Sequence, residues 1–207
     1  MEGKGSVSTG RYLSFVFDLD GTLFTVPVDW KGVRKELERI IGHPLENSPL
    51  FNQLHRIIAE NPGIRTRVFS AIDSFELEAA PRSEPKPGAV ELLQSLSKSS
   101  RPVALVTMQG MAICDELLRR HEVDRFFSVK VTREYSLDRS EQILKVIDEM
   151  GAVSATTLLI GDLPNDVVCA RRSNVDVAIV GKNGPRMEPR PDYAFDSFAE
   201  LRAVISV

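Results

Sequence analysis

The feature that most constrains the fold is a short apolar run that ends in two carboxylates. Residues 15–17 read Phe-Val-Phe, and residues 18–22 read Asp-Leu-Asp-Gly-Thr. An apolar run of this length that stops at turn residues is typical of a buried strand. In open parallel α/β sheets, ligands bind where such strands end. Asp18 and Asp20 repel each other there unless a cation or a shared proton relieves the repulsion. The segment therefore predicts a metal ion, a proton-transfer role, or both.

The chain beyond this run alternates between apolar strands and amphipathic helices. Further strands are expected at 103–107, 127–131, 157–160, 176–180 and 193–195. Helices are expected from 87 onward, and over 112–121, 139–150, 164–173 and 197–205. This alternation indicates an α/β fold with a doubly wound, Rossmann-like parallel sheet.

A long insertion separates the first strand from the next one. A parallel crossover needs only about a dozen residues, and strand 103–107 begins far beyond that distance. The insertion has apolar residues at helical spacing, with Gly42 and a run of prolines from Pro81 to Pro87 as helix breakers. We therefore expect three parts: a core domain over 12–27 and 85–207, a helical cap domain over 28–84, and a flexible tail over 1–11.

Composition excludes several classes of partner. The formal net charge of −3 over 207 residues gives no basic field for nucleic acid. The sequence contains no apolar run long enough to span a bilayer, and residues 1–11 lack the apolar core of a signal peptide. We expect a cytoplasmic protein with no membrane partner, in which Cys114 and Cys169 are buried and reduced, although a disulfide between them stays open. The three histidines have no metal-ligand spacing.

A second acidic cluster follows the strand expected at 157–160. Residues 161–166 read Gly-Asp-Leu-Pro-Asn-Asp. Because parallel strands open on one edge, the carboxylates of both clusters are expected to converge on one hard cation, with Mg²⁺ favoured. The expected metal ligands are Asp18, Asp20, Asp162 and Asp166. Thr107 ends another strand at the same edge, and Met108 follows it just before a helix whose first amides suit a phosphate oxygen.

These motifs resemble those of the haloacid dehalogenase superfamily, in its phosphoglycolate phosphatase-like branch. The first family motif, Asp-x-Asp-Gly-Thr, matches residues 18–22; the second, a Thr or Ser that ends a strand, matches Thr107; and the fourth, Gly-Asp-x-x-x-Asp, matches residues 161–166. The third motif is a Lys or Arg at the start of a helix, usually followed by Pro, and that pair is missing here. Arg139 is the best match, Lys145 is the fallback, and Arg133 is a weaker candidate.

The resemblance implies a mechanism. Asp18 attacks a phosphoryl group to give an aspartyl-phosphate, and Asp20 protonates the leaving oxygen and later deprotonates water. Mg²⁺ binds Asp18, the Asp20 main-chain carbonyl and Asp162, while Asp166 holds the metal shell from behind or binds directly. Thr107 and Arg139 neutralise and orient the phosphoryl oxygens, and Met108 lies with them at the substrate.

The resemblance also implies that the helical cap closes over the site and restricts substrates to small molecules. Cap-side contacts are expected from Thr25, Trp30, Arg34, Arg65 and Arg67, with packing inside the cap as the alternative role for Trp30. The expected function is Mg²⁺-dependent hydrolysis of a small phosphorylated metabolite, either phosphoglycolate-like or a sugar phosphate. A phosphosugar mutase and a non-catalytic binding protein on the same scaffold are the alternatives, and the chain is expected to be a monomer or a homodimer.

Overall fold

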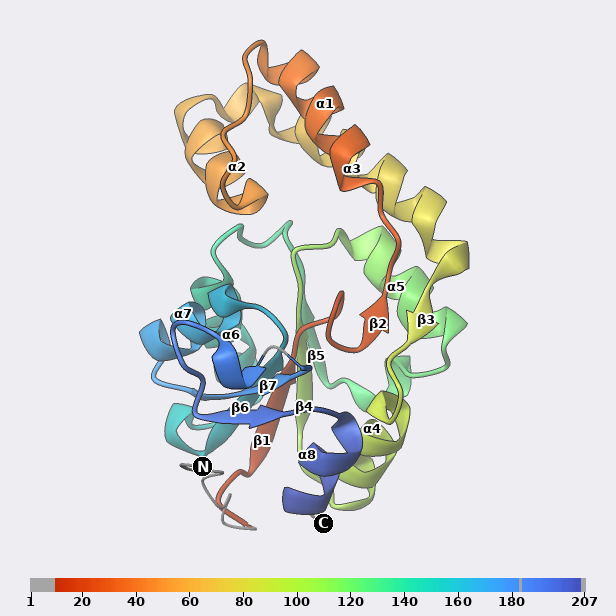
Figure 1. Cartoon of the computed structure of the whole chain (residues 1–207), viewed down its shortest axis with the longest axis vertical. Helices are drawn as coiled ribbons and strands as arrows, with labels where there is room; N and C mark the ends of the chain where they lie inside the picture. The colour runs from red at the N-terminus through yellow and green to blue at the C-terminus, as the bar shows by residue number, and fades with distance from the viewer. Residues whose placement is uncertain (1–9, 183, 206–207) are drawn as a thin grey trace.

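A computed structural model of the chain describes residues 10–182 and 184–205 (Figure 1). It shows an α/β core with a helical insert above one edge of its sheet (Figure 1). Most of the tail predicted to be flexible, residues 1–9, lies outside the described residues. Arg11, at the end of that tail, pairs with Asp176 at 2.6 Å, which ties this residue to the core.

The core sheet has six strands in the order β5-β4-β1-β6-β7-β8, and all neighbouring strands are parallel. The strands are β1 (Ser14–Phe17), β4 (Val103–Val106), β5 (Val129–Val131), β6 (Thr157–Gly161), β7 (Asp176–Val180) and β8 (Tyr193–Phe195). This arrangement confirms the doubly wound parallel sheet. The strand order turns back at β1, with β4 on one side and β6 on the other, so the end of β1 is the switch point at which such sheets bind ligands.

Helices cover both faces of the sheet. The core helices are α4 (Ala89–Lys98), α5 (Met111–Arg120), α6 (Arg139–Glu149), α7 (Pro164–Arg172) and α8 (Phe198–Val204). Because side chains alternate along a strand, Phe15 and Phe17 of β1 pack with α4, α5 and α8, whereas Val16 packs with α6 and α7. Cys114 and Cys169 are buried and free, as predicted.

The insert lies between two short antiparallel strands, β2 (Phe24–Thr25) and β3 (Glu84–Pro85). Its helices are α1 (Trp30–Ile41), α2 (Leu50–Glu60) and α3 (Arg65–Ala79). They share a hydrophobic cluster of their own, which includes Val33, Leu54 and Ile72. Gly42 ends α1 with a φ of 90°, a left-handed conformation that suits glycine.

Some boundaries differ from the sequence-based prediction. Short 3₁₀ turns, which periodicity alone does not reveal, account for two of these differences. The turn Pro62–Ile64 leads straight into α3, so that helix begins at Arg65, whereas the helical spacing of apolar residues in this part of the insert begins only at Val68. The turn Asp124–Phe126 delays β5 until Val129. Among the described residues, no helix is both long and apolar enough to cross a membrane.

Candidate active site

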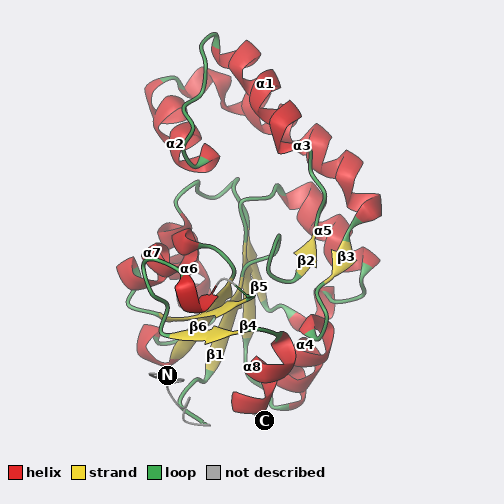
Figure 2. Cartoon of the chain, viewed as in Figure 1, coloured by secondary structure: helices red, strands yellow, loops and turns green. Residues whose placement is uncertain are grey.

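The carboxyl ends of β1, β4 and β6 meet the first turn of α6 at one cavity of about 340 Å³. Figure 2 shows the loops at this edge of the sheet facing the helices of the insert. The core side of the cavity is lined by Asp18, Asp20, Thr107, Met108, Gln109, Arg139, Leu163, Asn165 and Asp166. The insert side is lined by Trp30, Arg34, Pro49, Leu50, Phe51 and Asn52. Residues predicted from separate motifs therefore share one cavity.

Asp18 is the first residue after β1, and its carboxylate is buried and held on both oxygens. Arg139 Nη1 donates to Asp18 Oδ1 at 2.5 Å, and the Thr22 hydroxyl lies 3.0 Å from Asp18 Oδ2. Arg139 opens α6, and its Nη1 also lies 3.5 Å from Asp166 Oδ1. Burial alone lowers the pKa of Arg139, but Asp18 and Asp166 outweigh it and the net shift is upward. Arg139 is thus a permanent cation beside the Asp18 carboxylate.

Asp20 lies two residues after Asp18 in the same loop, and its carboxylate has different hydrogen-bond partners. Its Oδ1 accepts a hydrogen bond from the main-chain N of Val26 at 3.1 Å. Burial, followed by the charge of Asp18, raises the pKa of Asp20 to about 6. A carboxyl group with such a pKa exchanges a proton near neutral pH, which is what a general acid and base requires.

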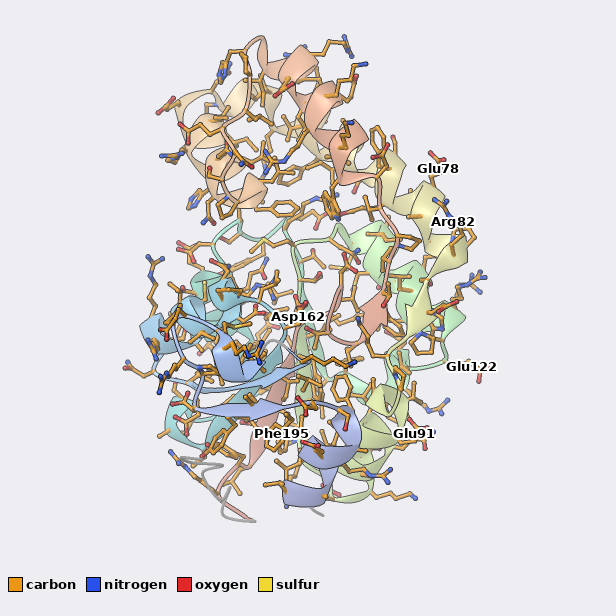
Figure 3. All side chains as sticks on the ribbon, viewed as in Figure 1. Glu78, Arg82, Glu91, Glu122, Asp162 and Phe195 are labelled. Atoms are coloured by element: carbon orange, nitrogen blue, oxygen red, sulfur yellow. The ribbon has the colours of Figure 1, made fainter. Side chains whose placement is uncertain are left out.

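Asp162 follows β6 and is half-buried in the core, below the insert (Figure 3). The Thr22 hydroxyl is 3.0 Å from Asp162 Oδ1 and also 3.0 Å from Asp18 Oδ2, yet it has only one proton to donate. Burial, together with the charges of Asp18 and Asp166, raises the pKa of Asp162 to about 7. A Cβ on Gly21 would lie 2.4 Å from Asp162 Oδ2, so the glycine of the first motif makes room for this carboxylate.

Asp166 holds the loop that carries Asp162. Its Oδ2 accepts hydrogen bonds from the main-chain N of Asp162 at 3.1 Å and of Leu163 at 3.0 Å. Its other oxygen faces Arg139 at 3.5 Å. Of the two roles predicted for Asp166, this placement favours support from behind over direct metal binding.

The carboxylates also bear on whether the site suits a metal ion. No group of three or more His, Cys, Asp or Glu side chains is placed to hold a metal ion within residues 10–182 and 184–205. Mg²⁺ does not need such a cage, because it commonly keeps several waters and binds through one or two carboxylates and a substrate phosphate. The Asp18 and Asp162 carboxylates share Thr22 as a neighbour, and burial together with the negative charges of Asp18 and Asp166 raises the pKa of Asp162. Their chemistry fits a hard divalent cation.

The loop after β4 forms the next part of the cavity wall. Thr107 Oγ1 accepts from the main-chain N of Gln109 at 3.1 Å, and Gln142 of α6 donates to the Thr107 main-chain O at 3.0 Å. Met108 and Gln109 line the cavity beside Thr107. The hydroxyl of Thr107 therefore stabilises the turn of its own loop, and Thr107 lines the same cavity as Asp18.

The insert side of the cavity combines one cation with apolar walls. The Arg34 guanidinium donates to the main-chain carbonyls of Glu46 at 3.1 Å and Ser48 at 2.7 Å. In the described part of the chain, we find no ion pair between Arg34 and a carboxylate. Trp30 packs edge-to-face on Phe51, with ring centroids 6.0 Å apart. This end of the cavity can therefore receive a group that is partly apolar and partly anionic.

The sequence profile of haloacid dehalogenase-like hydrolases matches residues 15–180, which include every carboxylate of the cavity. The chain belongs to the haloacid dehalogenase-like hydrolase family.

Individual members of the family resemble the chain over nearly its whole length. A phosphoglycolate phosphatase from Agrobacterium fabrum is 24% identical over 93% of each chain. The pyrophosphatase PpaX of Halalkalibacterium halodurans is 26% identical, over 93% of this chain and 96% of that protein. The structure of a haloacid dehalogenase-like hydrolase from Streptococcus pneumoniae superposes with a TM-score of 0.71 at 18% identity, over 95% of this chain and 99% of that one. The last likeness shows the shared fold.

Several residues predicted for the site of this haloacid dehalogenase-like hydrolase lie elsewhere. Arg65 donates to the main-chain O of Glu134 at 2.5 Å, Arg67 lines a separate hollow between α1 and α3, and Thr25 is exposed on β2. Lys145, the fallback for the third motif, pairs with Glu149 at 2.9 Å on the surface of α6. Arg133 is bound to Glu76 of α3.

Other lining residues were not predicted. Asn52 and Gln109 line the cavity, as does Asn165. Asn165 stands inside the fourth motif, so its position was visible in the sequence. Asn52 is brought to the cavity only by the packing of α2 against the rest of the insert, which helical periodicity does not specify.

Proposed function

We propose that this phosphatase of the haloacid dehalogenase-like family hydrolyses a small phosphate monoester through a phosphoryl group carried on Asp18, with Mg²⁺ bound beside it. The observation that supports this most is the pair of aspartates on one loop. Asp18 is buried against the Arg139 cation, whereas burial and Asp18 raise the pKa of Asp20 to about 6. A buried carboxylate that lies against a cation is suited to attack phosphorus, and a neighbouring carboxyl group with a pKa of about 6 is suited to act as the acid.

In the first step, an Asp18 oxygen forms a bond to phosphorus as the ester P–O bond breaks. Asp20 gives its proton to the leaving oxygen, so the alcohol departs neutral. Arg139 and the loop after β4 offer hydrogen-bond donors to the phosphoryl oxygens, where negative charge must be stabilised. In the second step, water attacks phosphorus, Asp20 takes its proton, and the bond to Asp18 breaks to release inorganic phosphate.

A bound metal ion would support this chemistry. Bound Mg²⁺ would neutralise charge on the phosphoryl group and relieve the repulsion between neighbouring carboxylates. The groups that would hold it are the Asp18 and Asp162 carboxylates and the Asp20 main-chain carbonyl. Asp166 would keep Asp162 in place through its hydrogen bond to the Asp162 main-chain N.

The cavity limits the substrate to a small metabolite with polar groups at both ends. Its volume of about 340 Å³ lies at the low end of the roughly 300–1,000 Å³ that small-molecule pockets span. Arg139 stands at the phosphoryl end, and Arg34 stands on the insert side, where its hydrogen-bond partners among the described residues are main-chain carbonyls. A leaving group with a carboxylate or several oxygens would suit Arg34. Phosphoglycolate-like esters and sugar phosphates both meet this description.

The test is phosphate release from a panel of phosphomonoesters, with Mg²⁺ and with chelator. We expect hydrolysis that needs Mg²⁺ and that Asp18→Asn reduces by at least about 10³-fold, because the variant lacks the nucleophile. Asp115→Asn is the matched control, since Asp115 is an exposed carboxylate on α5 that pairs with Lys130. No released phosphate from any ester would contradict the proposal.

The same panel separates the alternatives. Isomerised sugar phosphate without free phosphate would indicate a phosphosugar mutase, and binding of esters without turnover would indicate a non-catalytic protein. A cytoplasmic location and a monomeric or homodimeric state stay predictions, which cell fractionation and light scattering would check.

A further inference from the structure

A buried cluster of charges joins the insert to the core at some distance from the catalytic aspartates. Arg133, in the loop after β5, and Glu76, on α3, are both 0% exposed. Arg133 Nη1 donates to the two carboxylate oxygens of Glu76 at 2.8 and 2.9 Å. Arg133 Nη2 also contacts Asp73, one turn before Glu76 on the same helix. A cation of the core is thus clamped by two acids of an insert helix.

The same two residues hold the loop 107–110, which follows β4 and lines the cavity. Arg133 Nη1 donates to the main-chain O of Met108 at 2.9 Å. Glu76 Oε2 accepts from the main-chain N of Gly110 at 3.3 Å. The main-chain N of Arg133 reaches the main-chain O of Gln109 at 3.4 Å. The backbone of this loop is therefore fixed by the ion pair between insert and core.

The side chains around Gly110 leave no room for a β-carbon at this position. A Cβ at position 110 would lie 2.3 Å from Asp73 Oδ1 and 2.9 Å from Arg133 Nη2.

Glu78, only two residues after Glu76 on α3, is exposed on the outer side of the helix (Figure 3). The two carboxylates of one helix thus have opposite surroundings.

Because Glu76 and Arg133 are buried, loss of either charge is expected to disrupt the whole cluster. Removing one member of a buried ion pair leaves the other charge without compensation, which is far more costly than losing a surface pair. Moving α3 away from the core would strip Arg133 of Glu76 and Asp73 together, while Glu76 would lose Arg133 and the Gly110 main-chain N. The loop 107–110 would then lose its hydrogen bond to Glu76, and Arg133, which donates to the Met108 carbonyl, would lose the acids that hold it in place.

We propose that Glu76 and Arg133 are positioning residues that make the shape of the loop 107–110 depend on the seating of insert helix α3. The proposal rests on the proposed function, in which this loop receives the phosphoryl oxygens. Phosphate then binds tightly only while α3 is packed against the core. The phosphate affinity of the loop therefore depends on the position of the insert. Neither residue is among those that line the cavity.

The experiment measures inorganic phosphate binding by calorimetry, together with kcat and KM, on the full chain with Mg²⁺. Glu76→Gln removes a charge while it keeps the size of the side chain. We expect it to weaken phosphate binding and raise KM by about tenfold, as expected when one charged partner of a buried network is lost. Glu78→Gln, the matched control on the same helix, should change neither quantity.

A double-mutant cycle with Arg133→Met distinguishes a direct coupling between the two residues from a general loss of stability. If the pair acts as a unit, the double variant should lose much less phosphate affinity than the two single losses multiplied together. A Glu76→Gln protein that melts earlier but binds phosphate like the wild type would overturn the inference and leave the proposed function standing. A wild type that binds no phosphate and hydrolyses no ester would overturn both. If Arg133→Met does not fold, Gly110→Ala replaces it, because it displaces the same loop from the α3 side.

Discussion

The two ends of the cavity are built by different means. At the core end, Asp18 and Thr107 stand directly after parallel strands, and Arg139 opens a core helix, so their places follow from the backbone of the core. At the insert end, Arg34 and Phe51 stand on α1 and α2, whose apolar side chains pack into the hydrophobic cluster of the insert. In the proposed function, the core end carries out the chemistry and the insert end selects the leaving group.

Charge differs between the two ends in the same way. The core end concentrates acids whose pKa burial and mutual repulsion raise, to about 6 for Asp20 and about 7 for Asp162, around one guanidinium. The insert end offers the Arg34 guanidinium, whose hydrogen-bond partners are neutral carbonyls. A phosphate monoester with an oxygen-rich tail complements both ends once a cation joins the acids.

Among the variants that compare the two ends, the largest effect is expected at the core end, at Arg139. Arg139→Met should lower kcat by about 10²–10³-fold, because it removes a donor placed where phosphoryl charge develops. Stopped assays of phosphate release would measure it. Lys145→Met is the matched control on the same helix and should stay within twofold of the wild type, since Lys145 pairs with Glu149 on the surface. Equal losses in the two variants would contradict the assignment of the third motif to Arg139.

The difference between the two ends also explains what the sequence reveals. Apolar runs that stop at Asp18, Thr107 and Asp162 mark strand ends, and parallel topology brings strand ends together. For that reason the fold and the core end follow from pattern alone, even with the Lys-Pro pair missing beside Arg139. No comparable rule places side chains of the insert, because their direction depends on how three helices pack. Arg34 lines the cavity, as predicted, whereas Arg65 and Arg67 are not among its lining residues, and Asn52 lines it without having been predicted.

A smaller effect should appear in stability rather than rate. Because the pKa of Asp162 is raised to about 7 in the folded chain, the folded state keeps a proton there that the unfolded chain releases. In metal-free protein, the free energy of unfolding should therefore fall as pH rises from about 4 through about 7. Asp162→Asn should flatten this slope and stabilise the metal-free protein at pH 8 by about 2 kcal/mol.

Chemical denaturation at pH 5 and pH 8 would measure this difference. Added Mg²⁺ should raise the free energy of unfolding of the wild type at pH 8. It should not change that of Asp162→Asn, because the variant lacks the Asp162 carboxylate that would bind the cation. A variant that gains as much stability from Mg²⁺ as the wild type does would place the ion elsewhere.

The smallest expected effect lies at the insert end and separates recognition from chemistry. Arg34→Met keeps much of the apolar stem and removes the charge, so it should raise KM by about tenfold for an ester with an anionic leaving group while kcat changes little. An ester with a neutral, apolar leaving group should show no such rise. Arg67→Met is the control, since Arg67 lines a different hollow of the insert. If Arg34→Met lowered kcat as far as Arg139→Met does, the two ends of the cavity would share the chemistry, because a residue that only recognises the leaving group stabilises bound substrate and transition state alike.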